Sequence, residues 1–138
     1  MLEQGLVMFI QSNLGSPPMA IGGFLNELPK DYIAATMGPA YTYRIISDIA
    51  ELTLNSCTGR SRARYEFKCY AFDAAGALAL AKAINSALHG KRGITLADID
   101  STWIDTCFRV DQMDMPYDAY ARNYCRQLEY EIQYANTN

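Results

Sequence analysis

Histidine is almost missing from this sequence, and the cysteines are too far apart to form a metal site in its place. His89 is the only histidine, and the chain has four cysteines without a Cys-x-x-Cys pair: Cys57, Cys69, Cys107 and Cys125. Structural zinc sites need such ligands at close spacing. We therefore predict no metal site, and we expect the cysteines to be free thiols with mostly structural roles in a reducing compartment.

Catalytic and phosphate-binding motifs are missing as well. The chain has no Gly-x-x-x-x-Gly-Lys-Ser/Thr loop, no Gly-x-Gly-x-x-Gly fingerprint and no Gly-x-Ser-x-Gly turn. His89 precedes Gly90, an arrangement typical of the end of a helix. The sequence therefore predicts neither an enzyme nor a bound cofactor.

Long apolar runs and an excess of positive charge are also absent. No run approaches the roughly 18 apolar residues of a membrane-spanning helix, and the start Met-Leu-Glu-Gln-Gly lacks the features of a secretory signal, so we expect the chain to stay in the cytoplasm where it is made. Twelve Lys and Arg against 15 Asp and Glu give a net charge of −3 and a pI near 5.0. This balance excludes a protein that binds nucleic acid over its whole surface, although it allows a local basic patch. Six clustered aspartates do not follow the calcium-loop spacing and are interpreted as a solvated rim: Asp98, Asp100, Asp105, Asp111, Asp114 and Asp118.

What is present, first, is a clear strand pattern in the middle of the chain. From Arg62 to Phe72 the odd positions are apolar and the even positions up to Lys68 are charged. This period of two predicts a strand with one buried face. At 138 residues the chain fits one domain, residues 1–138, with one core that this strand would help to build.

Three further segments have strand patterns. They are Tyr41 to Ile49, Ile99 to Val110, and Tyr120 or Arg122 to Tyr134. A polar stretch from Glu51 to Ser61 is expected to form the long tip of a hairpin. The tyrosines from Tyr117 onward alternate with Leu and Ile, which favours sheet packing over base stacking.

Two helices and one irregular segment complete the predicted domain. Apolar residues at helical spacing predict helices over 2–14 and 74–88, and Asp73 is a suitable N-cap for the second. Residues 15–39 hold eight of the 14 Gly and Pro residues, which excludes a long regular element. The predicted fold is α+β: a mainly antiparallel four-stranded sheet with two helices packed on one face, and a long Gly/Pro-rich segment after the first helix.

The charged row on the central strand is the candidate functional surface. Alternating charges on a strand have two interpretations, a solvated face or a contact with acids of a neighbouring subunit that sets orientation and register. The residues that we predict for a subunit or partner interface are Arg60, Arg62, Arg64, Glu66, Lys68, Glu129 and Glu131.

In the order and spacing of these segments the chain resembles the tail-completion, or tail-terminator, proteins of long-tailed bacteriophages and gene-transfer particles. The resemblance rests on Pro39-Ala40-Tyr41-Thr42-Tyr43-Arg44-Ile45-Ile46, on Leu54 to Gly59 leading into the strand from Arg62 to Ala71, on the Ala-rich helix ending at Leu88-His89-Gly90, and on the final strand. Ala40 separates Pro39 from Tyr41, which the family typically joins, and the segment from Gly15 to Gly38 matches only loosely.

The resemblance implies a structural protein of the virion. Such a protein forms a ring, with six subunits expected, that caps the tail tube at its head-proximal end, stops tube polymerisation and binds the head connector. The implied partners are other copies of the chain, the tail tube protein and the connector or neck protein, while DNA passes through the ring without specific binding. The alternatives are another neck or head-completion ring protein and a small ligand-binding α+β module.

Overall fold

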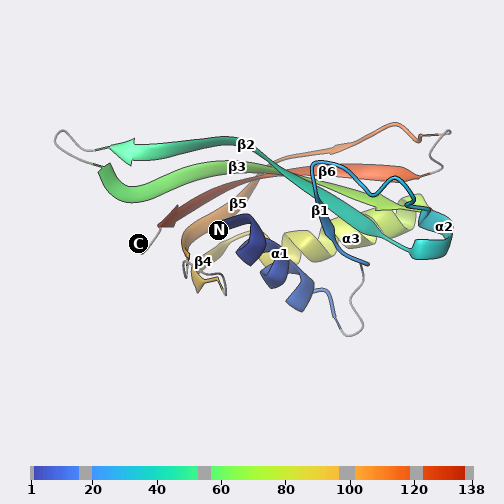
Figure 1. Ribbon diagram of the computed structural model, residues 1–138, viewed down its shortest axis with the longest axis horizontal. Helices are drawn as coiled ribbons and strands as arrows, with labels where there is room; N and C mark the ends of the chain where they lie inside the picture. The colour runs from blue at the N-terminus through green and yellow to red at the C-terminus, as the bar shows by residue number, and fades with distance from the viewer. Residues whose placement is uncertain (1, 16–19, 53–56, 97–101, 119–122, 136–138) are drawn as a thin grey trace.

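The structure, a computed structural model, is built on one twisted sheet with helices α1 and α3 beneath it (Figure 1). It describes residues 2–15, 20–52, 57–96, 102–118 and 123–135. The elements follow in the order α1 (Leu2–Ser12), β1 (Gly23–Leu25), α2 (Ala34–Met37), β2 (Ala40–Leu52), β3 (Cys57–Ala71), α3 (Ala74–Leu88), β4 (Lys91–Thr95), β5 (Trp103–Asp114) and β6 (Tyr124–Ala135). The α+β class broadly holds, with strands in the majority.

The predicted four-stranded antiparallel sheet is wrong. The sheet has six strands in the order β1-β2-β3-β6-β5-β4. It is mixed, because β1 pairs with β2 in parallel while the other neighbours are antiparallel. The four predicted strands correspond to the inner strands β2, β3, β6 and β5, and the sequence prediction missed both edges.

The two edge strands were missed because neither has a recognisable pattern. β1 has three residues and lies inside the Gly/Pro-rich segment, where Gly23, Phe24 and Leu25 pair with Tyr41, Thr42 and Tyr43. β4 begins with Lys91 and Arg92, which are exposed. Gly93 in β4 has a φ of 64°, a conformation that favours glycine. In the sequence, Lys91-Arg92-Gly93 directly after the predicted helix end is typical of a turn.

The core lies between the sheet and the two long helices. The odd positions of β3 from Ala63 to Ala71 are all buried, which confirms the predicted strand face. Opposite them in the β6 ladder lie Leu128, Tyr130 and Ile132, also buried. β3 and β6 are the two middle strands of the sheet, so this row lies at the centre of the core.

Helix α3 is held over the middle of the sheet by apolar packing and by one polar contact. It packs against β3, β6 and β5, while α1 packs against α3 and contributes Leu6 and Ile10 to the core. Leu14, just after the end of α1, joins the same core. The hydroxyl of Tyr130 donates a hydrogen bond of 2.9 Å to Oδ1 of Asn85. The predicted caps are confirmed: Asp73 accepts from the Gly76 N–H, and Gly90 follows the C-cap His89 with a φ of 76°.

The β2–β3 hairpin is longer than the sequence predicted. Most of the stretch that we expected to be a polar tip belongs to the two strands, since β2 runs to Leu52 and β3 begins at Cys57. Figure 1 shows this hairpin extending well beyond the helices, at the left of the view. Its register shifts between Ile45 and Ser47, so that Ser47 and Ile49 lie opposite Arg64 and Arg62.

The cysteines that the structure describes in full are free thiols. Cys69 and Cys107 are buried and Cys125 is half-buried. Burial raises the pKa of the Cys107 thiol to about 12 and that of Cys125 to about 11. Thiols with such raised pKa values are poor nucleophiles at neutral pH, which agrees with the structural role that we predicted for them.

Candidate assembly surfaces

Neither α1 nor α3 covers the second face of the sheet, which we call the open face (Figure 1). The side chains that point to it are the even residues of β3 from Arg62 to Lys68 and their neighbours in the adjacent ladders. The predicted interface row therefore lies on this face. Its members have different environments, and they are best described one group at a time.

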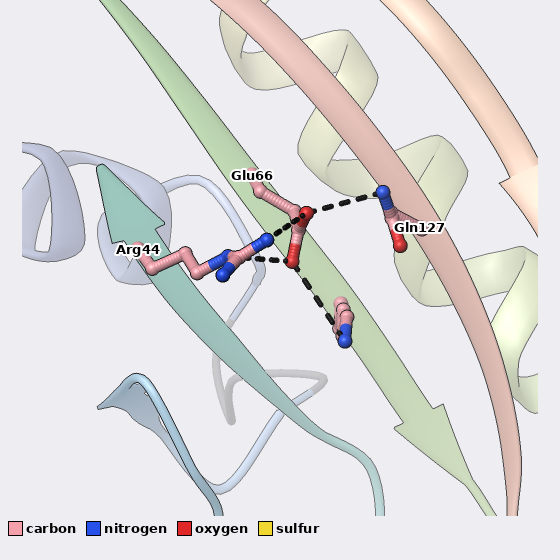
Figure 2. Close-up of polar contacts among 4 residues, drawn as sticks. Arg44, Glu66 and Gln127 are labelled. Atoms are coloured by element: carbon pink, nitrogen blue, oxygen red, sulfur yellow. Dashed lines mark hydrogen bonds and ion pairs between the residues drawn. The ribbon is translucent and has the colours of Figure 1, made fainter. Parts of the chain in front are cut away.

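The centre of the open face is a buried carboxylate surrounded by donors. Glu66 is 5% exposed, although it was predicted as part of an exposed row. Figure 2 shows Arg44 from β2 and Gln127 from β6 approaching it from opposite sides. Arg44 Nε and Nη2 donate to the two carboxylate oxygens at 3.1 Å each, and Gln127 Nε2 donates to Oε2 at 3.2 Å. The hydrogen bond with Glu66 raises the pKa of Arg44.

Glu66 therefore acts inside the subunit as a link between three strands. Lys68 Nζ lies 3.8 Å from Oε1 and adds a fourth contact. A carboxylate that accepts several charge-assisted hydrogen bonds is tightly fixed. Glu66 was predicted as part of the row, but Arg44 and Gln127 were not, because only the cross-strand register brings them beside it.

Replacing Glu66 with alanine should lower the free energy of unfolding by about 1.5–3 kcal/mol, the usual value for hydrogen bonds to a charged group. The matched control is Glu129→Ala. Glu129 lies directly opposite Glu66 in the β3–β6 ladder and is only half-buried, so its replacement should change stability by no more than about 0.5 kcal/mol. Urea denaturation of both variants measures the difference, and equal losses would show that Glu66 is not a special link.

The rest of the predicted row is more exposed. Arg62 Nε lies 3.4 Å from Glu131 Oε1, and the Arg62 side chain is 53% exposed. Arg64 is exposed and helps to line a small pocket of ≈ 190 Å³ with Ser47, Ile49 and Arg62. Arg60 pairs with Ala135 in the ladder, but the prediction for its side chain lies outside the described residues. The basic part of the row that remains available to a partner is thus Arg62 and Arg64.

Large apolar side chains are exposed along the hairpin and along β5. On β2, Ile45, Ile46 and Ile49 are 41%, 43% and 63% exposed. On β5 the exposed set is Trp103, Phe108, Val110 and Met113. Such patches commonly mark contacts with other proteins.

A groove separates α3 from the end of β5. It contains two neighbouring pockets of ≈ 450 and ≈ 430 Å³ that share Leu78 and Arg126. The first is mainly apolar and is lined by α3 alanines, Met115, Tyr117 and Tyr124, and the second includes Lys82 and Arg109. This groove could not be predicted from the sequence, because its lining comes from three elements far apart in the chain.

The groups that we considered for chemistry do not come together. Among residues 2–15, 20–52, 57–96, 102–118 and 123–135, no three His, Cys, Asp or Glu side chains are grouped as metal ligands. His89 Nδ1 accepts a hydrogen bond of 3.0 Å from the backbone N–H of Arg109, where it joins the helix end to β5. In the same described ranges no helix is long and apolar enough to cross a membrane.

Comparison with known proteins identifies a similar fold but no family. No family model matches the chain, and no curated protein matches it. Among solved structures, the fold is similar to that of a chain in the virion of a native gene transfer agent particle, with a TM-score of 0.55 and 13% sequence identity. The alignment covers 95% of this chain and 84% of the other. At this identity the match shows a shared fold, which extends over nearly the whole chain.

Proposed function

We propose that this protein is a structural component of a phage-like virion, and specifically a tail terminator. In this role copies of the chain form a ring, of six subunits as the sequence resemblance implies, at the head-proximal end of the tail tube. The ring stops tube polymerisation and binds the head connector. The chain acts by contact with other proteins and not as an enzyme.

The observation that carries the proposal is the similarity of almost the whole domain to a chain of a gene transfer agent virion. It agrees with the independent sequence resemblance to tail terminators, which rests on the order and spacing of the strands and of the Ala-rich helix. The surface supports the same proposal, because the hairpin and β5 expose large apolar side chains, and exposed apolar patches commonly mark contacts with other proteins. A net charge of −3 also suits a ring through which DNA passes without being held.

The test is electron microscopy of particles produced without this protein. A terminator should leave tails of abnormal length and heads without tails. Tails of normal length that lie detached beside full heads would instead indicate a neck or head-completion protein that only joins the two parts. Normal, complete particles would overturn the proposal.

Reversing both exposed arginines of the open face should weaken assembly without unfolding the subunit. In Arg62→Glu/Arg64→Glu the loss of one exposed ion pair with Glu131 costs about 0–1 kcal/mol, whereas two reversed charges at an interface cost several kcal/mol. Sedimentation and head–tail joining measure assembly, and circular dichroism measures folding. Lys91→Glu/Arg92→Glu, on the exposed edge strand β4, is the control. The interface role is refuted if the Arg62/Arg64 variant sediments and joins tails normally.

A further inference from the structure

The β1 edge of the sheet and the groove between α3 and β5 lie at the same height on opposite sides of the subunit. The cross-strand register places Leu25 beside Tyr43, Tyr43 beside Phe67, Phe67 beside Leu128, and Leu128 beside Gln112. Gln112 is one of the residues that line the groove. A row of paired residues across the sheet therefore connects the end of β1 to the groove.

The segment that begins at the last residue of β1 carries exposed apolar and acidic side chains. We call residues 25–33 the edge loop. Leu25 and Ile33 are 56% and 57% exposed, and Glu27 and Asp31 are exposed carboxylates, with Lys30 as the single basic residue between them. Asn26, directly after Leu25, has a φ of 66°, a left-handed conformation that ends the extended backbone of β1. The loop thus presents apolar and acidic groups at the side of the subunit.

The groove has one apolar and one basic pocket, which complement the apolar and acidic side chains of the edge loop. Its apolar pocket can receive aliphatic side chains, and its second pocket is lined by Lys82, Arg109 and Arg126, with no acidic residue among its lining. Arg126 forms an ion pair with Asp114 through Nη1 at 3.1 Å, but its buried Nε has no hydrogen-bond partner. Lys82 and Arg109 are exposed cations in this lining, so the groove can bind carboxylates of another molecule by charge complementarity.

We propose that the edge loop of one copy docks in the groove of the next copy and forms the lateral contact of the ring. Leu25 and Ile33 enter the apolar pocket, while Glu27 and Asp31 approach Lys82 and Arg109. This contact deepens the proposed function and rests on it. The edge loop and the groove are different surfaces that lie at the same height on opposite edges of the subunit. A contact between them is therefore head-to-tail. Its repetition can close into a ring, whereas a symmetric dimer would need the same surface on both copies.

The experiment uses two charge-reversed variants of the full chain, alone and mixed. The loop variant is Glu27→Lys/Asp31→Lys, and the groove variant is Lys82→Glu/Arg109→Glu. All four residues are exposed or line an open groove, so both variants should stay folded by circular dichroism. Native mass spectrometry, with tail-tube protein added where the chain alone does not assemble, should find each variant at least tenfold weaker in ring formation. Mixing them should restore the ring, since each altered loop then meets a groove of opposite charge.

The possible outcomes distinguish failure of the loop-in-groove contact from failure of the proposed terminator function. Rings of normal mass from each variant alone, or no recovery on mixing, would overturn the loop-in-groove contact and leave the terminator proposal standing. An unaltered chain that stays monomeric with and without tail-tube protein would overturn the ring itself, and the contact with it. Lys91→Glu/Arg92→Glu, on the same sheet edge as the groove but outside it, is the control and should form normal rings.

Discussion

Replacing Phe67 with alanine should lower the free energy of unfolding by about 3–5 kcal/mol. Phe67 is 1% exposed and lies in the middle of the central strand. Its ring meets Tyr130 edge-on at 5.7 Å and lies 6.4 Å from the rings of both Tyr41 and Tyr65. Because these neighbours belong to β2, β3 and β6, they cannot all move in to fill the space, and the cavity should remain largely open.

The matched control for this prediction is Phe72→Ala. Phe72 lies just beyond the end of the same strand and is 59% exposed, so its removal should cost no more than about 0.5–1 kcal/mol. Chemical denaturation of both variants, with equal m-values, measures the difference. A loss below about 1 kcal/mol for Phe67→Ala would contradict the placement of the odd positions of β3 in the core.

The inner strands and the helix α3 could be predicted because their burial is regular. On β3 from Ala63 to Ala71 and on β6 from Leu128 to Tyr134 every second residue is buried, so apolar and polar residues alternate. On α3 a stripe of small and aliphatic residues faces the sheet, with Asp73 as a capping residue. In both cases the local spacing of apolar residues indicates which face of the element is buried in the tertiary structure.

The edges and the hairpin could not be predicted because nothing periodic marks them. β1 is defined by its pairing with β2 and has no strand pattern of its own in the sequence. β4 is an exposed strand whose charged residues are typical of a turn. In β2 the register shift between Ile45 and Ser47 moves Ser47 and Ile49 to the open face. A bulge of this kind breaks the alternation on which strand prediction depends.

The candidate surfaces were also only partly predictable from the sequence. The alternation on β3 correctly identified a charged face, but it did not distinguish Glu66, which is buried among intrachain donors, from Arg64, which is exposed. That difference depends on which residues lie opposite in the neighbouring strands. The groove depends on three elements and on the edge of the sheet, so no segment of sequence could reveal it.

Replacing Gly23 with alanine should detach the edge loop from the sheet. A Cβ atom on Gly23 would lie only 2.4 Å from Cε2 of Tyr41 and 2.6 Å from its Cζ. Tyr41 is 0% exposed and packs against Phe67, so its ring has no room to retreat. Overpacking of this kind costs about 1–3 kcal/mol. Loss of the three-residue β1 pairing is the easiest way to relieve it, because the rest of the sheet does not depend on β1.

The neighbouring glycine provides a close control for this last effect. A Cβ atom on Gly22 would meet the Phe24 ring at 3.6 Å, an ordinary contact, so Gly22→Ala should be nearly neutral. We expect Gly23→Ala to increase hydrogen exchange at the Asn26 amide, which donates to the Tyr43 carbonyl at 2.9 Å, and to weaken ring formation at least tenfold. Equal exchange and equal assembly in the two variants would show that β1 does not position the edge loop. Faster exchange with normal rings would show that the loop is displaced without consequence, and the lateral contact would then have to lie elsewhere.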